Sequence, residues 1–244
     1  MSIQLRDLQI LKFVYTHRVA TYNQISRRFF VGKHSTLVER CLRRHREANY
    51  LNPYPIRIGN KINQYVEVTA KGFELIKESW DFDVDNPLFK SESPLHDINL
   101  NEIIFKLEGL KSFKTFYSEN ILQSSSALKV DLTLADLVKL YSDGALLLNG
   151  PDGLLYVYAV EFEQSKKNPD RYREKLQSYY RASGIDGVIY VYSSQEIANS
   201  LSKIDREVCS DDKSILYLSS VENVLNSKGK IYFENNKTQG IELY

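Results

Sequence analysis

The chain is poor in the residues that build disulfide frameworks and zinc sites. Its 244 residues include 2 cysteines, Cys41 and Cys209, and 4 histidines. The two cysteines have no metal-ligand spacing between them, so we interpret them as thiols of a reducing compartment. The histidines never occur as an H-x-H pair. This argues against a zinc site and against a nicking enzyme of the HUH type.

Long apolar runs are also missing. No stretch of 18 consecutive apolar residues occurs, and the opening MSIQLRDLQILKF carries charges inside its apolar pattern. Membrane-spanning helices and secretion signals need uninterrupted apolar segments. The sequence therefore predicts a cytoplasmic protein with no membrane partner.

The net charge is small but unevenly distributed. Residues 1–80 hold 14 Lys or Arg and 6 Asp or Glu, a net charge of +8, whereas residues 81–244 hold 18 and 25, a net charge of −7. The length allows one large domain or two modest ones. A basic module followed by an acidic one is typical of a DNA-binding domain joined to a domain that holds cations.

The basic part has the pattern of a winged helix-turn-helix. We expect helices over residues 5–17 and 35–48, a helix opening after Thr21, strands over 51–58 and 62–68, and a helix opening at Thr69. Thr21 can form a capping box with Gln24, which marks the start of the second helix. Three helices followed by a β-hairpin match this DNA-binding fold, which we assign to residues 1–80.

Positive charge is concentrated in the third of these helices, which in this fold enters the major groove. The wing tip of the same fold lies against phosphate. A solvated helix face is the alternative interpretation of such a charge run. The residues that we expect to contact double-stranded DNA are Lys33, His34, Ser35, Arg40, Arg43, Arg44 and Lys61.

Residues 81–94 are rich in Pro, Ser and acidic side chains without periodicity, and we interpret them as a linker. A second domain then spans 95–244 and opens with a helix that carries His96, Asn101 and Glu102. These side chains can serve a DNA-processing site. Alternatively, His96 packs at a domain interface and its neighbours only cap the helix.

The most informative stretch runs from Asp143 to Lys175. Two apolar runs around the turn at Asn149–Gly153 predict a β-hairpin. Glu161 and Glu163 end the second run and share one face of the strand. Together with Asp143, they form a cluster of three carboxylates, whose negative charges repel one another unless a cation compensates. Ligands that offer only oxygen suit Mg²⁺ or Mn²⁺. The alternative is a solvated acidic rim at a strand end, outside the core.

The helix that follows, predicted over residues 169–183, brings a lysine to this region. Arg171 and Lys175 are four residues apart and share a helical face. We expect that face to lie opposite the apolar one formed by Tyr172, Leu176 and Tyr179. Lys175 is then free to supply an ammonium group beside the acids.

A leading Asp, an E-x-E one hairpin later and a lysine-bearing helix resemble the PD-(D/E)XK nuclease superfamily. The resemblance implies that Asp143 is the first acid and Glu161 the second. Glu163 then stands where a lysine is usual, and Lys175 supplies the missing charge from the helix. It also implies a restriction-endonuclease-like αβββαβ domain, and thus an α+β or α/β chain overall.

The winged-helix pattern, LHDINLNE, SDGALLL and VEFEQSKKNPDRYREKLQSYY together resemble the replication-relaxation family, which includes the MOBC class of plasmid mobilisation relaxases. The resemblance covers about Leu8 to Ser193. It implies a sequence-specific protein that nicks DNA at a transfer or replication origin, aided by an accessory mobilisation protein. The implied catalytic residues are Asp143, Glu161, Glu163, Lys175, His96 and Glu102, with Asn101 in support and Mg²⁺ or Mn²⁺ on the first three. The alternative is a non-enzymatic regulator with a degenerate nuclease domain.

Overall fold

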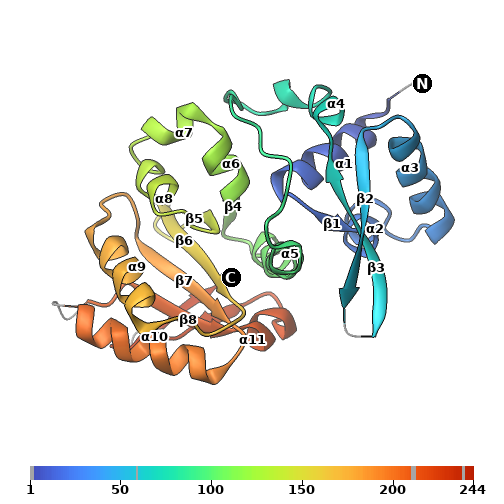
Figure 1. The fold of residues 1–244 in the computed structure, drawn as a ribbon. Coiled ribbons are helices and arrows are strands. Elements are labelled where there is room, and N and C mark those ends of the chain that lie inside the picture. Colours follow the sequence, from blue (N-terminus) through green and yellow to red (C-terminus); the bar gives the residue numbers. More distant parts are fainter. Residues whose placement is uncertain (1–2, 59, 210–212, 238–239) are drawn as a thin grey trace. The chain divides into compact units, whose positions relative to one another are not determined.

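The computed structural model describes residues 3–58, 60–209, 213–237 and 240–244 (Figure 1). The fold is a mixture of helices and sheets, as expected for an α+β chain. Two compact units can be distinguished, Met1–Asn101 with Ser124–Ser126, and Glu102–Gln123 with Ala127–Tyr244. The segment 81–94 belongs to the first unit, and the domain limits drawn from the sequence stay predictions.

The first unit consists of short helices and a small antiparallel sheet in the order β1-β3-β2. Its elements are α1 (Leu5–Thr16), β1 (Ala20–Thr21), α2 (Tyr22–Phe29), α3 (Ser35–Glu47), β2 (Leu51–Ile58), β3 (Lys61–Val68), α4 (Ala70–Phe73), the 3₁₀ turn η1 (Lys77–Ser79) and the first part of α5 (Pro94–Glu108). The core between the helices includes Ile10, Val14, Ile25 and Leu42, which are fully buried.

Local sequence signals explain the start of α2. Thr21 accepts a hydrogen bond from the Gln24 backbone, and the Gln24 side chain accepts one from the Thr21 backbone, which confirms the predicted capping box. The Gln24 amide also donates to the Ile98 carbonyl at 2.8 Å. The cap residue therefore also holds the start of α5 within this unit.

The second unit is built on a five-stranded sheet in the order β4-β5-β6-β7-β8. Its elements are β4 (Phe113–Ser118), α6 (Glu119–Ser124), α7 (Ser126–Val130), α8 (Ala135–Lys139), β5 (Gly144–Asn149), β6 (Leu155–Glu163), α9 (Pro169–Arg181), β7 (Gly187–Tyr192), α10 (Gln195–Val208), β8 (Leu216–Ser220), α11 (Val221–Asn226), β9 (Ile231–Phe233) and β10 (Ile241–Leu243). The first three strands are antiparallel, and β6, β7 and β8 are parallel. Parallel neighbours need crossover connections, which α9 and α10 provide.

The predicted hairpin is confirmed as β5 and β6. Their pairing runs from Gly144 opposite Val160 to Asn149 opposite Leu155, and Gly153 closes the turn with a φ of 79° that favours glycine. The second strand continues to Glu163, as predicted, and it also pairs in parallel with β7 as far as that residue. Its acidic end is therefore part of the sheet.

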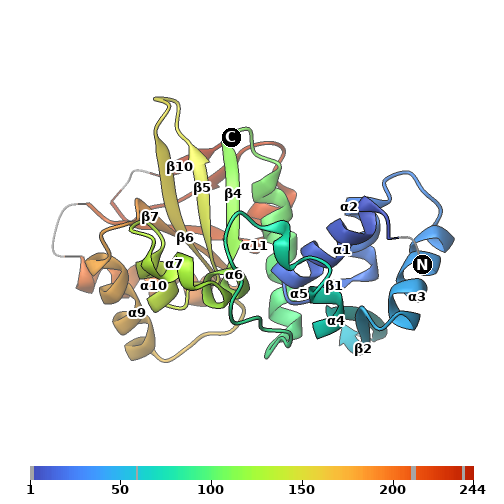
Figure 2. The same ribbon diagram turned by 90° about the horizontal axis from the view of Figure 1, so that it is seen from above.

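Helix α9 begins at residues that favour a helix start, with Asn168 as the N-cap and Pro169 in the first turn. Figures 1 and 2 show α9 and α10 beside each other. Arg173 of α9 contacts Glu207 of α10 at 2.9 Å, and the Tyr180 hydroxyl donates to Asp205 at 2.7 Å. The pair of helices thus forms one layer over the parallel strands.

The structure decides one open alternative and adds one strand that was not predicted. Residues 130–140, whose pattern fitted either a strand or a short helix, contain the end of α7 and all of α8. Helices of five residues are too short for apolar periodicity to identify. Strand β10 was not expected, and it pairs with β9. No helix in the described ranges is both long enough and apolar enough to cross a membrane.

Candidate functional site

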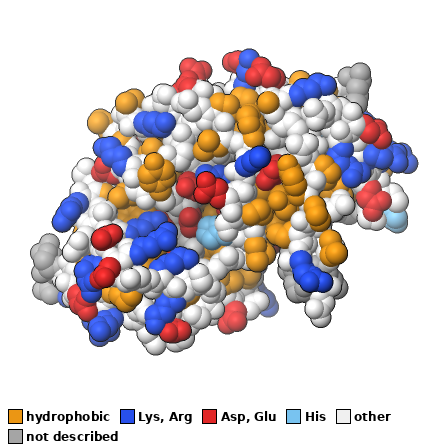
Figure 3. Space-filling view, viewed as in Figure 1, with side chains coloured by type: hydrophobic (Ala, Val, Ile, Leu, Met, Phe, Trp, Pro, Cys, Tyr) orange, Lys and Arg blue, Asp and Glu red, His pale blue; other side chains and the backbone are white. Residues whose placement is uncertain are grey.

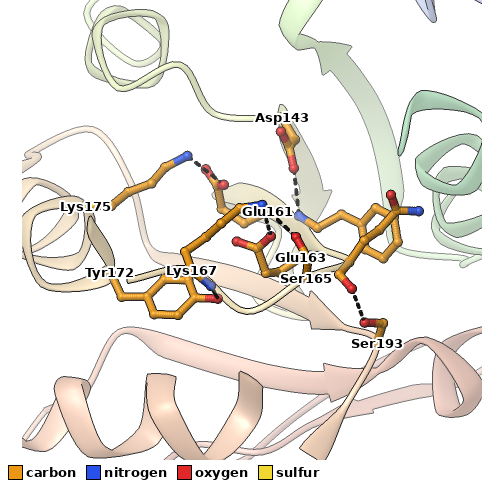
Figure 4. A network of polar contacts seen from close by, with 10 residues as sticks. Asp143, Glu161, Glu163, Ser165, Lys167, Tyr172, Lys175 and Ser193 are labelled. Carbon is orange, nitrogen blue, oxygen red and sulfur yellow. Dashed lines mark hydrogen bonds and ion pairs between the residues drawn. The ribbon is translucent and has the colours of Figure 1, made fainter. Parts of the chain in front are cut away.

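The predicted acids and the predicted lysine meet at one end of the β5–β6 hairpin (Figure 4). Asp143 directly precedes β5, Glu161 and Glu163 are among the last three residues of β6, and Lys175 lies in the middle of α9. The register explains the meeting, because Gly144 opposite Val160 places the preceding Asp143 beside Glu161. The sheet and the helix layer thereby bring three separate segments together.

Asp143 is fixed by backbone contacts. Its Oδ2 accepts a hydrogen bond from the Phe162 N–H at 2.7 Å, and its carbonyl accepts one from the Glu119 N–H at 2.9 Å. Phe162 itself is buried in the core, as the strand alternation predicts. The carboxylate therefore has a defined position next to the strand that carries the other two acids.

Glu161 is the most enclosed of the three acids. Only 4% of it is exposed, its Oε2 lies 2.7 Å from the Lys175 ammonium, and its Oε1 accepts a hydrogen bond from the Tyr179 hydroxyl. The Ser142 hydroxyl lies 2.7 Å from the same tyrosine oxygen. The alternative of a solvated rim outside the core is wrong for Glu161, because β7 and α9 cover this end of the strand.

Burial also sets the protonation of this carboxyl. Burial raises the pKa of Glu161 to about 7, the Lys175 ammonium opposes the rise, and the Asp143 charge adds to it. Burial lowers the pKa of Lys175, but the Glu161 carboxylate outweighs this effect and the net shift is upward. Lys175 is therefore protonated at neutral pH, beside a carboxyl that titrates near neutrality.

The orientation of α9 corrects one prediction. We expected Lys175 on the face opposite Tyr179, yet both side chains reach the same Glu161 carboxylate. At 100° per residue, Lys175 lies about 40° from Tyr179 around the helix. The lysine is thus at the edge of the buried face, with 26% of its side chain exposed.

Glu163 has a different partner. Its Oε1 lies 3.2 Å from the Lys167 ammonium, and 12% of its side chain is exposed. The segment that carries Lys167 is held in place, because its backbone N–H donates to the Tyr172 hydroxyl at 3.0 Å and the Ser193 hydroxyl donates to the Gln164 carbonyl at 2.8 Å. Each glutamate therefore has its own lysine.

The three acids fit Mg²⁺ or Mn²⁺ by their chemistry. They offer only oxygen donors, and burial next to another carboxylate makes a cation favourable. In the described ranges, however, their ligand oxygens do not all lie within 4.8 Å of one another. Binding by all three therefore requires side chains of this group to move toward one another.

The residues of α5 that were predicted to support the catalytic site are divided between the two units. His96 and Asn101 belong to the first unit, in which the His96 ring lies 3.3 Å from Asp97 and the Asn101 amide donates to the Val19 carbonyl at 2.9 Å. Glu102 begins the second unit. Asn101 therefore has a structural contact, and the proposed catalytic roles of His96 and Glu102 stay predictions.

The predicted DNA-contact residues lie on and before α3. Lys33, His34, Ser35, Arg40 and Arg43 are exposed, and the His34 side chain caps the helix by accepting from the Thr36 N–H. Figure 3 shows Lys and Arg side chains gathered where Figure 1 draws α3. Lys61 begins β3, but its side chain, like Gly59 of the predicted wing turn, lies outside the described residues.

Arg44 is placed differently from its neighbours. Its guanidinium lies 3.4 Å from Asp7 of α1, and 35% of its side chain is exposed. Arg40, Arg43 and Arg46 instead line a hollow of about 500 Å³ with Tyr22. The exposed arginines, rather than Arg44, are therefore the ones available to a ligand of this surface.

One group of potential metal ligands was not predicted from the sequence. Asp7, Cys41 and His45 are all buried, and each has one ligand atom within 4.8 Å of those of the other two. Cys41 and His45 are four residues apart on α3, a spacing that places both on one helical face. That spacing was a usable signal, but Asp7 comes from another helix.

Comparison with known proteins identifies no relative. No protein-family model, no curated protein and no solved structure matches this chain.

Proposed function

We propose that this chain is a sequence-specific DNA-binding protein that nicks DNA with a divalent-metal-dependent site, acting in the mobilisation of a plasmid or another mobile element. The observation that carries the proposal is the buried Glu161–Lys175 pair next to Asp143. An acid pair at a hairpin end and an ammonium from the next helix are the parts that phosphodiester cleavage requires.

The order of the elements supports a PD-(D/E)XK-like assignment of the second unit. Apart from the short helices α6, α7 and α8 between β4 and β5, the elements from α5 to β7 follow one another as α, β, β, β, α, β. The acids lie at the second and third strands of this series and the lysine lies on its second helix. In the first unit, three helices, the β2–β3 hairpin and the cap residues support a winged helix-turn-helix.

The roles of the side chains follow from their contacts. Asp143, Glu161 and Glu163, after side-chain movement, would hold Mg²⁺ or Mn²⁺, which when bound would supply positive charge against the scissile phosphate. Lys175 keeps its proton at neutral pH and stabilises charge that develops on the phosphate oxygens. Tyr179 positions Glu161 by a hydrogen bond.

DNA binding rests on the exposed arginines of α3. Arg40 and Arg43 are exposed on a helix that carries four arginines and two glutamates. Glu47 lies 3.7 Å from Arg43, and Glu39 lines the same hollow as both arginines. Arginine suits both phosphate contacts and bidentate contacts to guanine. A transfer or replication origin is the class of double-stranded DNA that this proposal requires, and an accessory mobilisation protein is a further partner.

A plasmid assay tests the proposal. Rounds of selection from a random-sequence duplex library would first give a DNA site bound by the full chain, and this site would be cloned into a supercoiled plasmid. Incubation with Mn²⁺ should convert the plasmid to the open-circular form, while the parental plasmid should be nicked at least ten times more slowly. A chain that binds the selected site but leaves both plasmids supercoiled contradicts the proposed activity.

The alternative is a non-enzymatic DNA-binding regulator, and one observation favours it. Each glutamate is already neutralised by its own lysine, Glu161 by Lys175 and Glu163 by Lys167. Such pairs stabilise an acidic strand end without any cation. Under this alternative, the chain binds the selected DNA with an affinity that does not change when Mn²⁺ is added.

A further inference from the structure

The first unit contains a buried group of potential metal ligands that the proposed nuclease site does not use. Asp7 of α1 and Cys41 and His45 of α3 are between 0% and 2% exposed. Their ligand atoms, one carboxylate oxygen, one sulfur and one ring nitrogen, all lie within 4.8 Å of one another. We propose that these three residues bind one zinc-class divalent ion that ties α1 to α3.

The distances around Asp7 fit a coordination shell. The Cys41 sulfur and the His45 Nε2 each lie 3.4 Å from Asp7 Oδ1. Bonds of about 2.0–2.3 Å at tetrahedral angles would put neighbouring ligand atoms about 3.3–3.6 Å apart. Two of the three spacings therefore already match a tetrahedral shell, and the third, between Cys41 and His45, is within 4.8 Å.

His45 supplies an independent indication. Neither of its ring nitrogens makes a hydrogen bond, although the residue is only 1% exposed. Buried polar groups are nearly always paired, since an unpaired one costs about 1–3 kcal/mol. Nε2 faces Asp7 at a distance longer than the usual 2.9–3.0 Å, roughly, of N–H···O bonds. A metal ion gives this nitrogen a partner.

The donor types select the kind of ion. A thiolate and an imidazole favour Zn²⁺ over Mg²⁺ or Mn²⁺, which prefer oxygen. Asp7 is already oriented, because its Oδ2 accepts the Gln4 N–H at 3.0 Å at the start of α1. Cys41 and His45 are oriented by the single helix that carries both. The zinc-class site is therefore chemically distinct from the acids of the second unit.

Arg44 is the competitor for this site. Its Nη2 lies 3.4 Å from Asp7 Oδ1 and can neutralise the carboxylate without an ion. It is also the most exposed member of the group, so it can turn outward and leave the fourth ligand position to water. If the arginine remains the partner of Asp7, the cluster is only a polar part of the core, and no ion binds.

Metal titration of the full chain, without a histidine tag, tests the proposal. Co²⁺ serves as a spectroscopic substitute for Zn²⁺, because thiolate ligation gives a charge-transfer band in the near ultraviolet. We expect one equivalent of Co²⁺ to bind with this band, and Zn²⁺ to displace it. The Cys41→Ala variant should lose the band and at least about 100-fold in Zn²⁺ affinity, more than is typical for a residue that only supports a ligand. Cys209→Ala, the matched cysteine control, should behave like the unchanged chain.

A second measurement covers the case in which Cys41→Ala does not fold. In the Cys209→Ala background Cys41 is the one remaining thiol, and Zn²⁺ should slow its reaction with a maleimide at least tenfold in partly denaturing urea. Absence of stoichiometric Co²⁺ or Zn²⁺ binding overturns the proposal. So does binding that is unchanged in folded Cys41→Ala, or a maleimide reaction that Zn²⁺ does not slow.

Discussion

The Lys175 ammonium lies 2.7 Å from the Glu161 carboxylate, which comes from the neighbouring strand β6 and is only 4% exposed. Glu161 stands beside Asp143, so the lysine offsets a repulsion that would otherwise raise the carboxyl pKa further. The same lysine still has 26% of its side chain exposed. It can therefore contact both the buried acid and a phosphate that approaches from solvent.

The first prediction concerns catalysis by Lys175. Lys175→Ala should lower the rate of plasmid nicking by about 100-fold or more, because it removes a positive charge that acts mainly in the transition state. DNA affinity should stay within about threefold, and so should Mn²⁺ affinity. The measurement is the rate of open-circle formation under saturating protein.

Two variants control this experiment. Lys175→Arg keeps the charge and should retain more activity than Lys175→Ala, and Lys203→Ala removes an exposed lysine of α10 and should leave the rate unchanged. An undiminished rate in Lys175→Ala would mean that this lysine is only a structural partner of Glu161.

The second prediction concerns the metal at the acids. Asp143→Asn and Glu161→Gln should each weaken Mn²⁺ binding at least tenfold in calorimetric titrations, since each removes a charged oxygen ligand. Glutamine can still accept the Tyr179 hydrogen bond, so we expect Glu161→Gln to fold, which circular dichroism would check. Glu174→Gln, at an exposed position of α9, is the matched control. Unaltered Mn²⁺ affinity in both site variants would place the ion elsewhere.

Local sequence signals predicted much of the fold and part of the site. The capping box at Thr21 and Gln24 and the hairpin turn before β6 depend on neighbours within a few residues, and both are confirmed. The burial of Glu161 depends on β7 and α9, which are distant in sequence. Such packing cannot be obtained from strand periodicity alone.

The two helices show one error and one omission. On α9, Lys175 and Tyr179 are four residues apart, so helical spacing itself places them on the same side, and the prediction of opposite faces was wrong. On α3, Cys41 and His45 are both buried, and their four-residue spacing places them on one face of the helix. Their third partner, Asp7, lies 34 residues before Cys41, and that contact is a property of the packed helices rather than of either segment.

The third prediction concerns DNA affinity. Replacing Arg40 and Arg43 together with alanine should weaken binding to the selected duplex, by about 1–3 kcal/mol for each arginine that contacts a base. Both side chains are exposed on α3, whereas Arg44 is engaged with Asp7 and is left unchanged. Fluorescence anisotropy at fixed salt measures the change. The slope of affinity against salt separates base contacts from phosphate contacts.

The matched control is the double variant Arg181→Ala and Arg206→Ala, which removes the same charge from exposed positions of α9 and α10. If both double variants lose affinity equally, the effect is one of net charge and the α3 surface is not the DNA contact.

The last prediction concerns pH and the buried His17. Burial, assisted by the nearby Arg28 charge, lowers the pKa of its ring to about 3, while a hydrogen bond with Asn101 acts in the opposite direction. Between pH 3 and pH 6.5 the unfolded chain therefore binds a proton that the folded first unit does not. The neutral His17 ring makes its full contribution to the free energy of unfolding above pH 6.5. This contribution falls with the pH and is about 2 kcal/mol smaller at pH 5.

Urea unfolding followed by fluorescence measures this loss in the first unit, because the single tryptophan, Trp80, lies there and packs against Tyr15. Between pH 7.5 and pH 5 the unchanged chain should lose about 2 kcal/mol more stability than His17→Gln, whose side chain does not titrate. The exposed His34→Gln variant should follow the unchanged chain. The other buried titratable groups are the same in all three proteins. The difference in pH-dependent stability between the variants therefore isolates the contribution of His17. Equal pH profiles for His17→Gln and the unchanged chain would mean that this ring accepts its proton without unfolding the unit.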